Sequence, residues 1–324
     1  MSLRTPLCDL LQIDHPIMLA GMGGVSYAEV TAAVSNAGGF GTLGMAGLGV
    51  ADIAAQVKKV KDLTDKPFGL DLLAALPDTL EKTADIIIDE GVAAFISGLG
   101  VPFNIKDKLQ AAGVKVMNVC GTVRHAQKAD AAGLDAVIAQ GTEGGGHTGK
   151  VAAMALVPQV VDAVSIPVVA AGGVVDGRGL AAALALGAAG VWVGTRFIAC
   201  AEAHAGELYK QAVLTARDED TIVTRCYTGK TMRTKVNAYV RDWEARPQDI
   251  KGFPEQVMIS AAAGVMGGIA GQIEGLDPER SCLAMGQGAG AVHEILPARE
   301  IIANMLAEAA DVIARMGSLV KSAS

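Results

Sequence analysis

The sequence has few aromatic residues, few charged residues and no long uninterrupted apolar run. Of its 324 residues, 4% are aromatic and 19% are charged, whereas 51% are hydrophobic. No apolar run approaches the roughly 20 residues that are needed to span a bilayer. Long basic blocks are also lacking, and the net charge is -7, which argues against general nucleic-acid binding. These absences favour a soluble globular protein with a sizeable core, and they predict no membrane or nucleic-acid partner.

Cysteine is sparse, and its distribution predicts neither disulfides nor a metal site. The chain has 5 cysteines and no CxxC pair, and it contains no HExxH motif. Its first ten residues, MSLRTPLCDL, hold no apolar signal core. We therefore expect a cytoplasmic protein with reduced thiols and no bound metal. The scattered cysteines are Cys8, Cys120, Cys200, Cys226 and Cys282.

Short apolar runs alternate with Ala-rich amphipathic stretches through the first two thirds of the chain. Buried parallel strands have near-continuous apolar sequences of this kind. Eight runs with seven helical stretches between them predict an α/β fold, the (β/α)8 TIM barrel. The predicted strands are 16–20, 40–45, 68–73, 93–98, 115–120, 136–141, 167–172 and 190–195. The predicted helices include 27–36, 51–63, 79–90, 123–132 and 179–186.

The ends of the predicted helices and the last third of the chain refine this organisation. Several helices end in glycine, which suits the left-handed residue that closes a helix. A doubly wound open sheet is the competing fold, but no GxGxxG follows the first predicted strand. After Thr195 the pattern changes, and we expect 201–291 to form a smaller helical domain that covers the substrate. Residues 1–200 would form the barrel, with 292–324 returning to it as the eighth helix.

Two glycine-rich loops predict a phosphate site. Active sites of such barrels lie at the carboxyl ends of the strands, and phosphate often binds after strands seven and eight. Those loops contain Gly172, Gly173, Gly194 and Thr195. Glycine backbone can approach an anion closely, although each loop alone could simply be a tight turn. The occurrence of both loops at this position favours phosphate binding.

The loop after the sixth predicted strand holds the best catalytic candidate. His147 follows three glycines, so its imidazole would be exposed at the barrel mouth, where it could serve as an acid or a base. The alternative is a structural histidine that only satisfies a carbonyl. Glu143 would either orient His147 or cap the following turn. The remaining histidines are expected to be structural, and they are His15, His125, His204 and His293.

One histidine and few other reactive side chains imply a cofactor that supplies the chemistry. A phosphate site beside glycine-rich loops that can pass a flat ring predicts flavin mononucleotide (FMN). No GxSxG elbow is present, and Cys120 is expected to be a buried thiol rather than a nucleophile.

At these residues the chain resembles the nitronate monooxygenase family (formerly 2-nitropropane dioxygenase), which consists of FMN-dependent TIM-barrel proteins. That family also contains FMN-dependent enoyl-ACP reductases, NADH:quinone reductases and flavin enzymes that act on steroid-derived CoA thioesters. The matching segments span the barrel: HPIMLAGMGGVS at 15–26, SNAGGFGTLG at 35–44, KPFGLDL at 66–72, EGGGHTG at 143–149, and AAGGVVDGRGLAAALALGAAGVWVGTRF at 170–197.

The resemblance implies a role for each matching residue. His147 would act as the base or as the hydrogen-bond partner of a substrate nitro group. Gly145 and Gly146 would flank the cofactor beside it. The residues implied to lie close to the flavin ring are Ala20, Gly21 and Met22, and those implied to hold the FMN phosphate are Gly172, Gly173, Gly194 and Thr195.

Two positions depart from the pattern of the family. Asp71 stands where relatives commonly have Asn, and Asn118 stands where several relatives have Lys. Both side chains would face the flavin. A lost cation and a gained carboxylate disfavour the negatively charged reduced ring, unless Asp71 is protonated or paired.

Two activities follow from the resemblance. The first is oxidation of alkyl nitronates by O2 to carbonyl compounds and nitrite. The second is an NAD(P)H-dependent flavin reductase acting on an enoyl-CoA or acyl-carrier thioester, or on a quinone. A basic segment at 221–241 would bind the phosphates of such ligands if it overhangs the barrel, or else form a solvated helix face. A flavin-binding sensor without turnover is a third reading, and the protein would be a monomer or a homodimer.

Overall fold

Eight parallel strands form the centre of the molecule. The computed structural model describes residues 3–73 and 77–319. All eight strands lie within the predicted ranges, because each apolar run is buried on both faces. The strands are β1 (Ile17–Leu19), β2 (Gly41–Gly44), β3 (Phe68–Leu73), β4 (Ala94–Gly98), β5 (Lys115–Cys120), β6 (Ala136–Gln140), β8 (Val168–Ala171) and β9 (Gly190–Val193).

The strands close into a barrel. Their order is β1-β9-β8-β6-β5-β4-β3-β2, and a parallel bridge between Met18 and Phe40 joins the two edges. Two hydrogen bonds of 2.9 Å support that bridge, from the Leu19 N–H to the Phe40 carbonyl and from the Phe40 N–H to the Ile17 carbonyl. This closure excludes the doubly wound sheet and confirms the (β/α)8 fold.

Large side chains fill the barrel interior. Met18, Ile96 and Trp192, from three different strands, and Phe40, directly before β2, belong to one buried cluster. The N-terminal helix α1 (Pro6–Leu11), which was not predicted, adds Leu7, Cys8 and Leu11 to the same cluster. The barrel is therefore a packed core, and only the ends of its strands can form a site.

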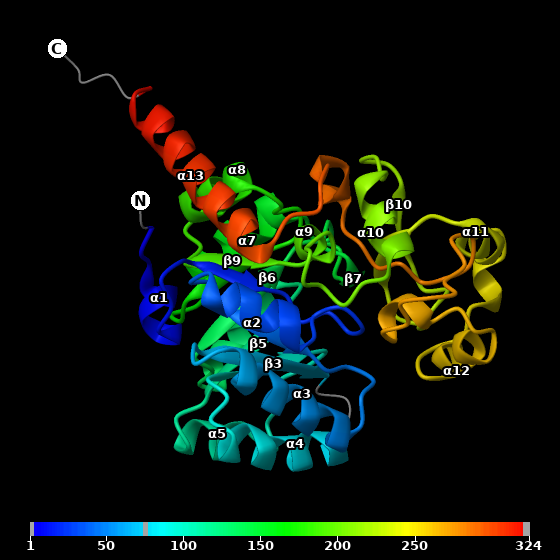
Figure 1. Ribbon diagram of the computed structural model, residues 1–324, viewed down its shortest axis with the longest axis horizontal. Coiled ribbons are helices and arrows are strands. Elements are labelled where there is room, and N and C mark those ends of the chain that lie inside the picture. Colours follow the sequence, from blue (N-terminus) through cyan, green and yellow to red (C-terminus); the bar gives the residue numbers. More distant parts are fainter. Residues whose placement is uncertain (1–2, 74–76, 320–324) are drawn as a thin grey trace.

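Helices surround the barrel between successive strands (Figure 1). Helix-ending glycines such as Gly38 and Gly133 have φ values of +85° and +73°, which confirms their predicted left-handed conformation. Among the described residues, no helix combines the length and the apolar character needed to cross a membrane. The helices are α2 (Ala28–Asn36), α3 (Val50–Leu63), α4 (Pro77–Asp89), α5 (Lys106–Ala111), α6 (Val123–Ala131), α7 (Ala153–Ala163) and α8 (Gly177–Ala185).

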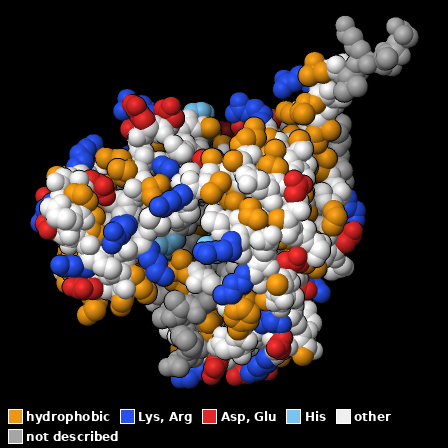
Figure 2. All heavy atoms as spheres, turned by 180° about the vertical axis from the view of Figure 1, so that it is seen from behind, with side chains coloured by type: hydrophobic (Ala, Val, Ile, Leu, Met, Phe, Trp, Pro, Cys, Tyr) orange, Lys and Arg blue, Asp and Glu red, His pale blue; other side chains and the backbone are white. Residues whose placement is uncertain are grey.

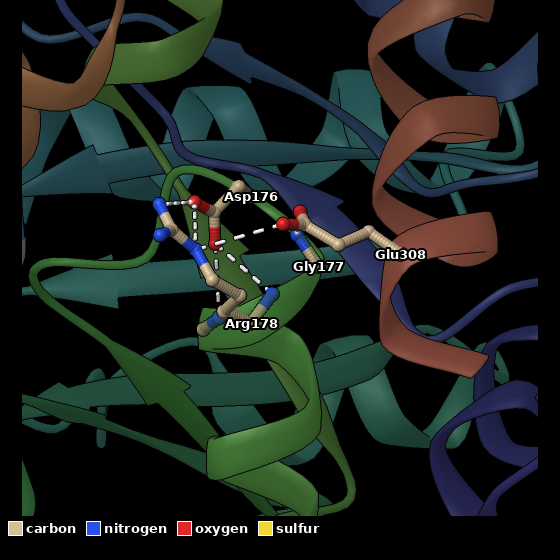
Figure 3. A network of polar contacts seen from close by, with 5 residues as sticks. Asp176, Gly177, Arg178 and Glu308 are labelled. Atoms are coloured by element: carbon tan, nitrogen blue, oxygen red, sulfur yellow. Dashed lines mark hydrogen bonds and ion pairs between the residues drawn. The ribbon is translucent and has the colours of Figure 1, made fainter. Parts of the chain in front are cut away.

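The last helix returns to the barrel. Helix α13 (Ala298–Gly317) packs against α8 and α2, so it takes the place of the eighth barrel helix (Figure 1). Glu308 on α13 accepts a 2.8 Å hydrogen bond from the Gly177 N–H at the start of α8 and lies 3.5 Å from Arg178 (Figure 3). A Cβ at Gly177 would lie 2.4 Å from the carbonyl oxygen of Met305, so only glycine permits this approach.

The segment 201–291, called the covering segment below, is not purely helical as predicted. Two strands, β10 (Thr221–Thr224) and β11 (Met232–Lys235), pair antiparallel, and β11 also pairs with β7 (Gly146–His147) from the sixth barrel loop. The expectation of an all-helical segment is wrong, because these strands lie between its short helices. The helices after β9 are α9 (Thr195–Ile198), α10 (Glu207–Leu214), α11 (Ala238–Glu244), α12 (Glu255–Ala262), and the 3-10 turns η1 (Pro247–Asp249), η2 (Gly267–Ile269) and η3 (Gln287–Ala291).

The contact between α8 and α13 generates a first prediction. Gly177→Ala should lower the free energy of unfolding by about 1–3 kcal/mol, since the new methyl group meets the backbone of α13. Urea unfolding followed by circular dichroism measures the change. The matched control is Gly317→Ala on α13, where an added Cβ would have no atom within 4 Å. Equal stability of the two variants would contradict the tight packing described here.

Candidate active site

A single cavity of about 1020 Å³ lies at the carboxyl ends of the barrel strands. Its walls come from the loops of the barrel and from the covering segment. Every residue predicted to bind cofactor or to act in catalysis lines this cavity. These residues are Ala20, Gly21, Met22, Asp71, Asn118, Gly145, Gly146, His147, Gly172, Gly173, Gly194 and Thr195.

The loops after β8 and β9 present unused backbone donors to one end of the cavity. Gly172 and Gly173 have φ values of +98° and +76°, a conformation that other residues rarely adopt. Within the described chain, the N–H groups of Gly173, Val174 and Gly194 have no hydrogen-bond acceptor. The Thr195 hydroxyl beside them accepts a hydrogen bond of 2.9 Å from the Gly286 N–H. N–H groups that face a cavity without a partner suit an anion, so this end fits the phosphate of FMN.

Asp71 is a partly buried carboxyl that faces the cavity at β3. A Cβ at Gly21 would lie 2.2 Å from the Asp71 Cβ, so the glycine of the first loop lets this side chain fit against the backbone. Burial raises the pKa of Asp71 to about 8. The carboxyl is therefore mostly protonated at neutral pH and brings no full negative charge to the cavity.

Asn118 is buried beside the cavity, but its amide nitrogen serves the neighbouring loop. It donates hydrogen bonds of 2.8 Å to the Ser97 carbonyl and 2.7 Å to the Gly100 carbonyl. Between them lies Leu99, whose φ of +59° is strained for a leucine. Asn118 thus holds a strained turn of the cavity wall, a role that was not predicted; contact with FMN through its other atoms stays a prediction.

His147 lies on β7, half-buried beneath the covering segment rather than exposed at the mouth as expected. Its Nε2 lies 3.0 Å from the buried Thr228 hydroxyl. Its backbone carbonyl accepts a hydrogen bond of 2.8 Å from the side-chain amide of Gln140. Burial, followed by the charge of Lys230, lowers the pKa of His147 below its usual range. The imidazole is therefore neutral at pH 7.

Two charged side chains near His147 have structural roles. Glu143 does not orient His147. Both of its carboxylate oxygens accept hydrogen bonds of 3.0 Å from the Ala153 N–H, so Glu143 caps the start of α7. Arg233 is buried and donates to the Thr142 carbonyl at 2.9 Å and to the Thr221 hydroxyl at 3.0 Å. Arg233 is therefore not available to ligand phosphates.

The prediction for the basic segment 221–241 is only partly right. Most of the segment forms the hairpin of β10 and β11, and only its end, with Arg241, lies on helix α11. Lys230 at the turn of the hairpin lines the cavity; its other basic residues, Arg225, Arg233, Lys235 and Arg241, do not. His125 was expected to be structural, yet it lies at the cavity wall with Lys128, both exposed on α6. No motif signals these two residues, since they occupy ordinary solvent-facing helix positions. In the described part of the chain, no cluster of metal-ligating side chains occurs.

The fold and the cavity define a TIM-barrel protein with a ligand-sized cavity at the carboxyl ends of its strands. The family model described as nitronate monooxygenase matches residues 4–308. The chain belongs to the nitronate monooxygenase family, which is flavin-dependent.

Individual relatives cover nearly the whole chain. A Mycobacterium tuberculosis protein named (3aS,4S,5R,7aS)-5-hydroxy-7a-methyl-1-oxo-octahydro-1H-indene-4-carboxyl-CoA dehydrogenase is 35% identical, and the match covers 99% of this chain and 100% of the relative. A probable nitronate monooxygenase of Staphylococcus saprophyticus is 33% identical, over 81% of this chain and 87% of the relative. The structure of FabK from Thermotoga maritima is similar with a TM-score of 0.90 at 34% identity, over 98% of this chain and 100% of that one.

Asp71 yields a prediction about pH. Its pKa is higher in the folded chain than its ordinary value of 3.8, so unfolding releases a proton between pH 4 and pH 8, and stability falls as pH rises through this range. Asp71→Asn has no carboxyl group to titrate, so its stability should not fall with pH for this reason. The stability gap between the variant and the wild type, both free of flavin, should widen by roughly 1.4 kcal/mol per pH unit until about pH 8.

Urea unfolding at pH 5, 6, 7 and 8 measures this gap. Asp62→Asn, at an exposed position on α3, controls for the loss of one carboxyl group as such. A gap that stays constant over the four pH values would show that Asp71 titrates normally.

Proposed function

We propose that this protein is an FMN-dependent oxidoreductase that acts on an acyl thioester of coenzyme A or of an acyl carrier. The observation that supports this proposal best is the extent of the cavity. At about 1020 Å³ it continues from the glycine loops past His147 to Lys128 on α6 and Phe253 in the covering segment. A cavity of this size has room for a cofactor together with a long ligand. The full-length relative from M. tuberculosis is named for a CoA thioester, which agrees with this choice.

The residues of the cavity suit FMN. The unpaired N–H groups of Gly173, Val174 and Gly194, with the Thr195 hydroxyl, would hold its phosphate. When bound, FMN would supply the hydride-transfer chemistry that the side chains lack. NAD(P)H is the proposed electron donor.

His147 would move the proton that accompanies hydride transfer. Nε2 of His147 lies 3.0 Å from the Thr228 hydroxyl, which also lies 3.2 Å from the Lys230 carbonyl. In this proposal the hydroxyl donates to that carbonyl, and its oxygen accepts the proton on Nε2. The lone pair of the neutral imidazole is then on Nδ1, to which no described group hydrogen-bonds. In this proposal Nδ1 takes the proton from the α-carbon, next to the carbonyl group, when a saturated thioester is oxidised. When an enoyl thioester is reduced, a protonated Nδ1 gives a proton to the same carbon.

Oxidation of alkyl nitronates to carbonyl compounds and nitrite is the second candidate. It is favoured by the family model and by the neutral His147, which suits hydrogen bonding to a nitro group or removal of an α-proton. A short nitronate would, however, leave the outer part of the cavity unfilled. We therefore rank the thioester first, although the sequence by itself favours the nitronate.

Anaerobic stopped-flow spectroscopy separates the two candidates. The flavin is first reduced chemically, so that the result does not depend on the donor, and a short 2-enoyl-CoA is then added. Rapid return of the oxidised flavin absorbance is expected; its absence, together with nitrite release and O2 uptake on addition of propane-2-nitronate in air, would replace the proposal by nitronate oxidation. Bleaching of the oxidised enzyme by NADH or NADPH tests the donor separately.

His147→Asn should slow reoxidation by the thioester by about 10²- to 10⁴-fold, because the general acid or base is lost. Reduction of the flavin by dithionite should be unchanged. In the wild type, reoxidation should lose rate as the pH rises through the lowered pKa of His147, because the α-carbon gains a proton in this direction and only the protonated ring can supply it. His293→Asn, at an exposed position away from this cavity, is the control; equal rates in both variants would remove His147 from the mechanism.

A further inference from the structure

Two lysines lie at the outer end of the cavity, on opposite walls. Lys128 comes from α6 of the barrel, and Lys230 comes from the turn between β10 and β11 in the covering segment. Figure 2 shows Lys and Arg side chains gathered around a hollow between the two parts of the molecule. The two lysines thus reach the same space from elements about 100 residues apart in the chain.

Each lysine ammonium is held over an aromatic ring. Lys128 Nζ lies 5.3 Å from the centre of the Phe103 ring, and Lys230 Nζ lies 4.6 Å from that of Phe253. These rings are 56% and 42% exposed, far more than a phenylalanine in the core. A ring face orients an ammonium group without neutralising it. Both lysines are therefore positioned by contacts that do not compensate an ammonium charge.

Among the residues that the structure describes, no carboxylate balances either charge. The ion pairs of the described residues include neither Lys128 nor Lys230. The one acidic residue among the described cavity residues is Asp71, on a barrel strand, with a carboxyl that is largely neutral. In a chain of net charge -7, an outer end with two unpaired cations favours a ligand with a negatively charged end.

We infer that Lys128 and Lys230 form a subsite for the phosphate groups of a phosphopantetheine thioester. This inference rests on the proposed function. It places the thioester near His147, the uncharged pantetheine arm along the cavity, and the phosphates between the two lysines. Phe103 and Phe253 would offer flat apolar surfaces beside those phosphates, where the adenine of coenzyme A could stack.

Coenzyme A and a carrier-bound arm share this chemistry, so the test uses three unreactive probes. Isothermal titration of the FMN-loaded protein with coenzyme A, 4′-phosphopantetheine and pantetheine measures binding without turnover. The variants are Lys128→Gln, Lys230→Gln and the double variant. Lys58→Gln, at an exposed position on α3 outside the cavity, is the matched control.

Each single variant should weaken coenzyme A binding by about tenfold, because one charge-assisted contact to phosphate is lost. The loss should be greatest at low ionic strength, and pantetheine binding should not change. Lys128→Arg and Lys230→Arg should retain most of the affinity. A matching loss for 4′-phosphopantetheine would assign the lysines to the phosphate that a carrier arm also has. A loss confined to coenzyme A would assign them to its adenosine phosphates.

Coenzyme A affinities within twofold of the wild type in both single variants would overturn the inference. So would a loss for pantetheine as large as that for coenzyme A, because it would indicate a structural defect. These outcomes are independent of the flavin experiment: a thioester that reoxidises the flavin with no dependence on either lysine removes the subsite and leaves the proposed function. If coenzyme A binds in a way that depends on the lysines but the thioester does not reoxidise the flavin, the subsite is kept and the proposed function is removed.

Discussion

The pairing of β7 with β11 is the contact on which the rest of the site depends. It sets Gly146 opposite Arg233 and His147 opposite Met232, and so joins a barrel loop to the covering segment. Burial of the Arg233 guanidinium is costly and lowers its pKa, but its hydrogen bonds to Thr142 and Thr221 offset part of that cost. The same pairing brings Thr228 within reach of the His147 ring. The orientation of the candidate base is thus set by residues more than 80 positions away in the chain.

The barrel could be predicted from the sequence because its signal is local and repeated. A barrel strand such as β6, with its run of AVIAQ, is largely buried, and an amphipathic helix follows most of the strands. Several of these helices end at a glycine, such as Gly133 after α6. The covering segment lacks that signal. Strands β10 and β11 have only four residues each, TIVT and MRTK, and β7 has two within a glycine loop. Their pairing depends on partners distant in sequence, which no local pattern reveals.

The candidate site also has a part that could be predicted from the sequence and a part that could not. Barrel topology brings the strand ends together, so the glycines and His147 could be placed in one cavity from their loops alone. The partner of each side chain could not be predicted. Glu143 caps α7 rather than orienting His147, and Asn118 holds the strained turn at Leu99, because of hydrogen bonds that depend on the exact approach of neighbouring loops. Lys128 was missed for another reason: it is an exposed helix residue, and only the fold turns it toward the cavity.

Charge is distributed unevenly along the cavity, and this links ligand binding to proton transfer. Burial keeps Asp71 largely protonated, whereas Lys230 retains its charge and lowers the pKa of His147. An anion bound at Lys230 would screen that charge, and the pKa of His147 would then rise toward its ordinary value. In the proposed subsite, a phosphate at the outer end would thus make His147 a stronger base while the thioester lies beside it. A short nitronate, which does not extend to Lys230, would leave His147 a weaker base.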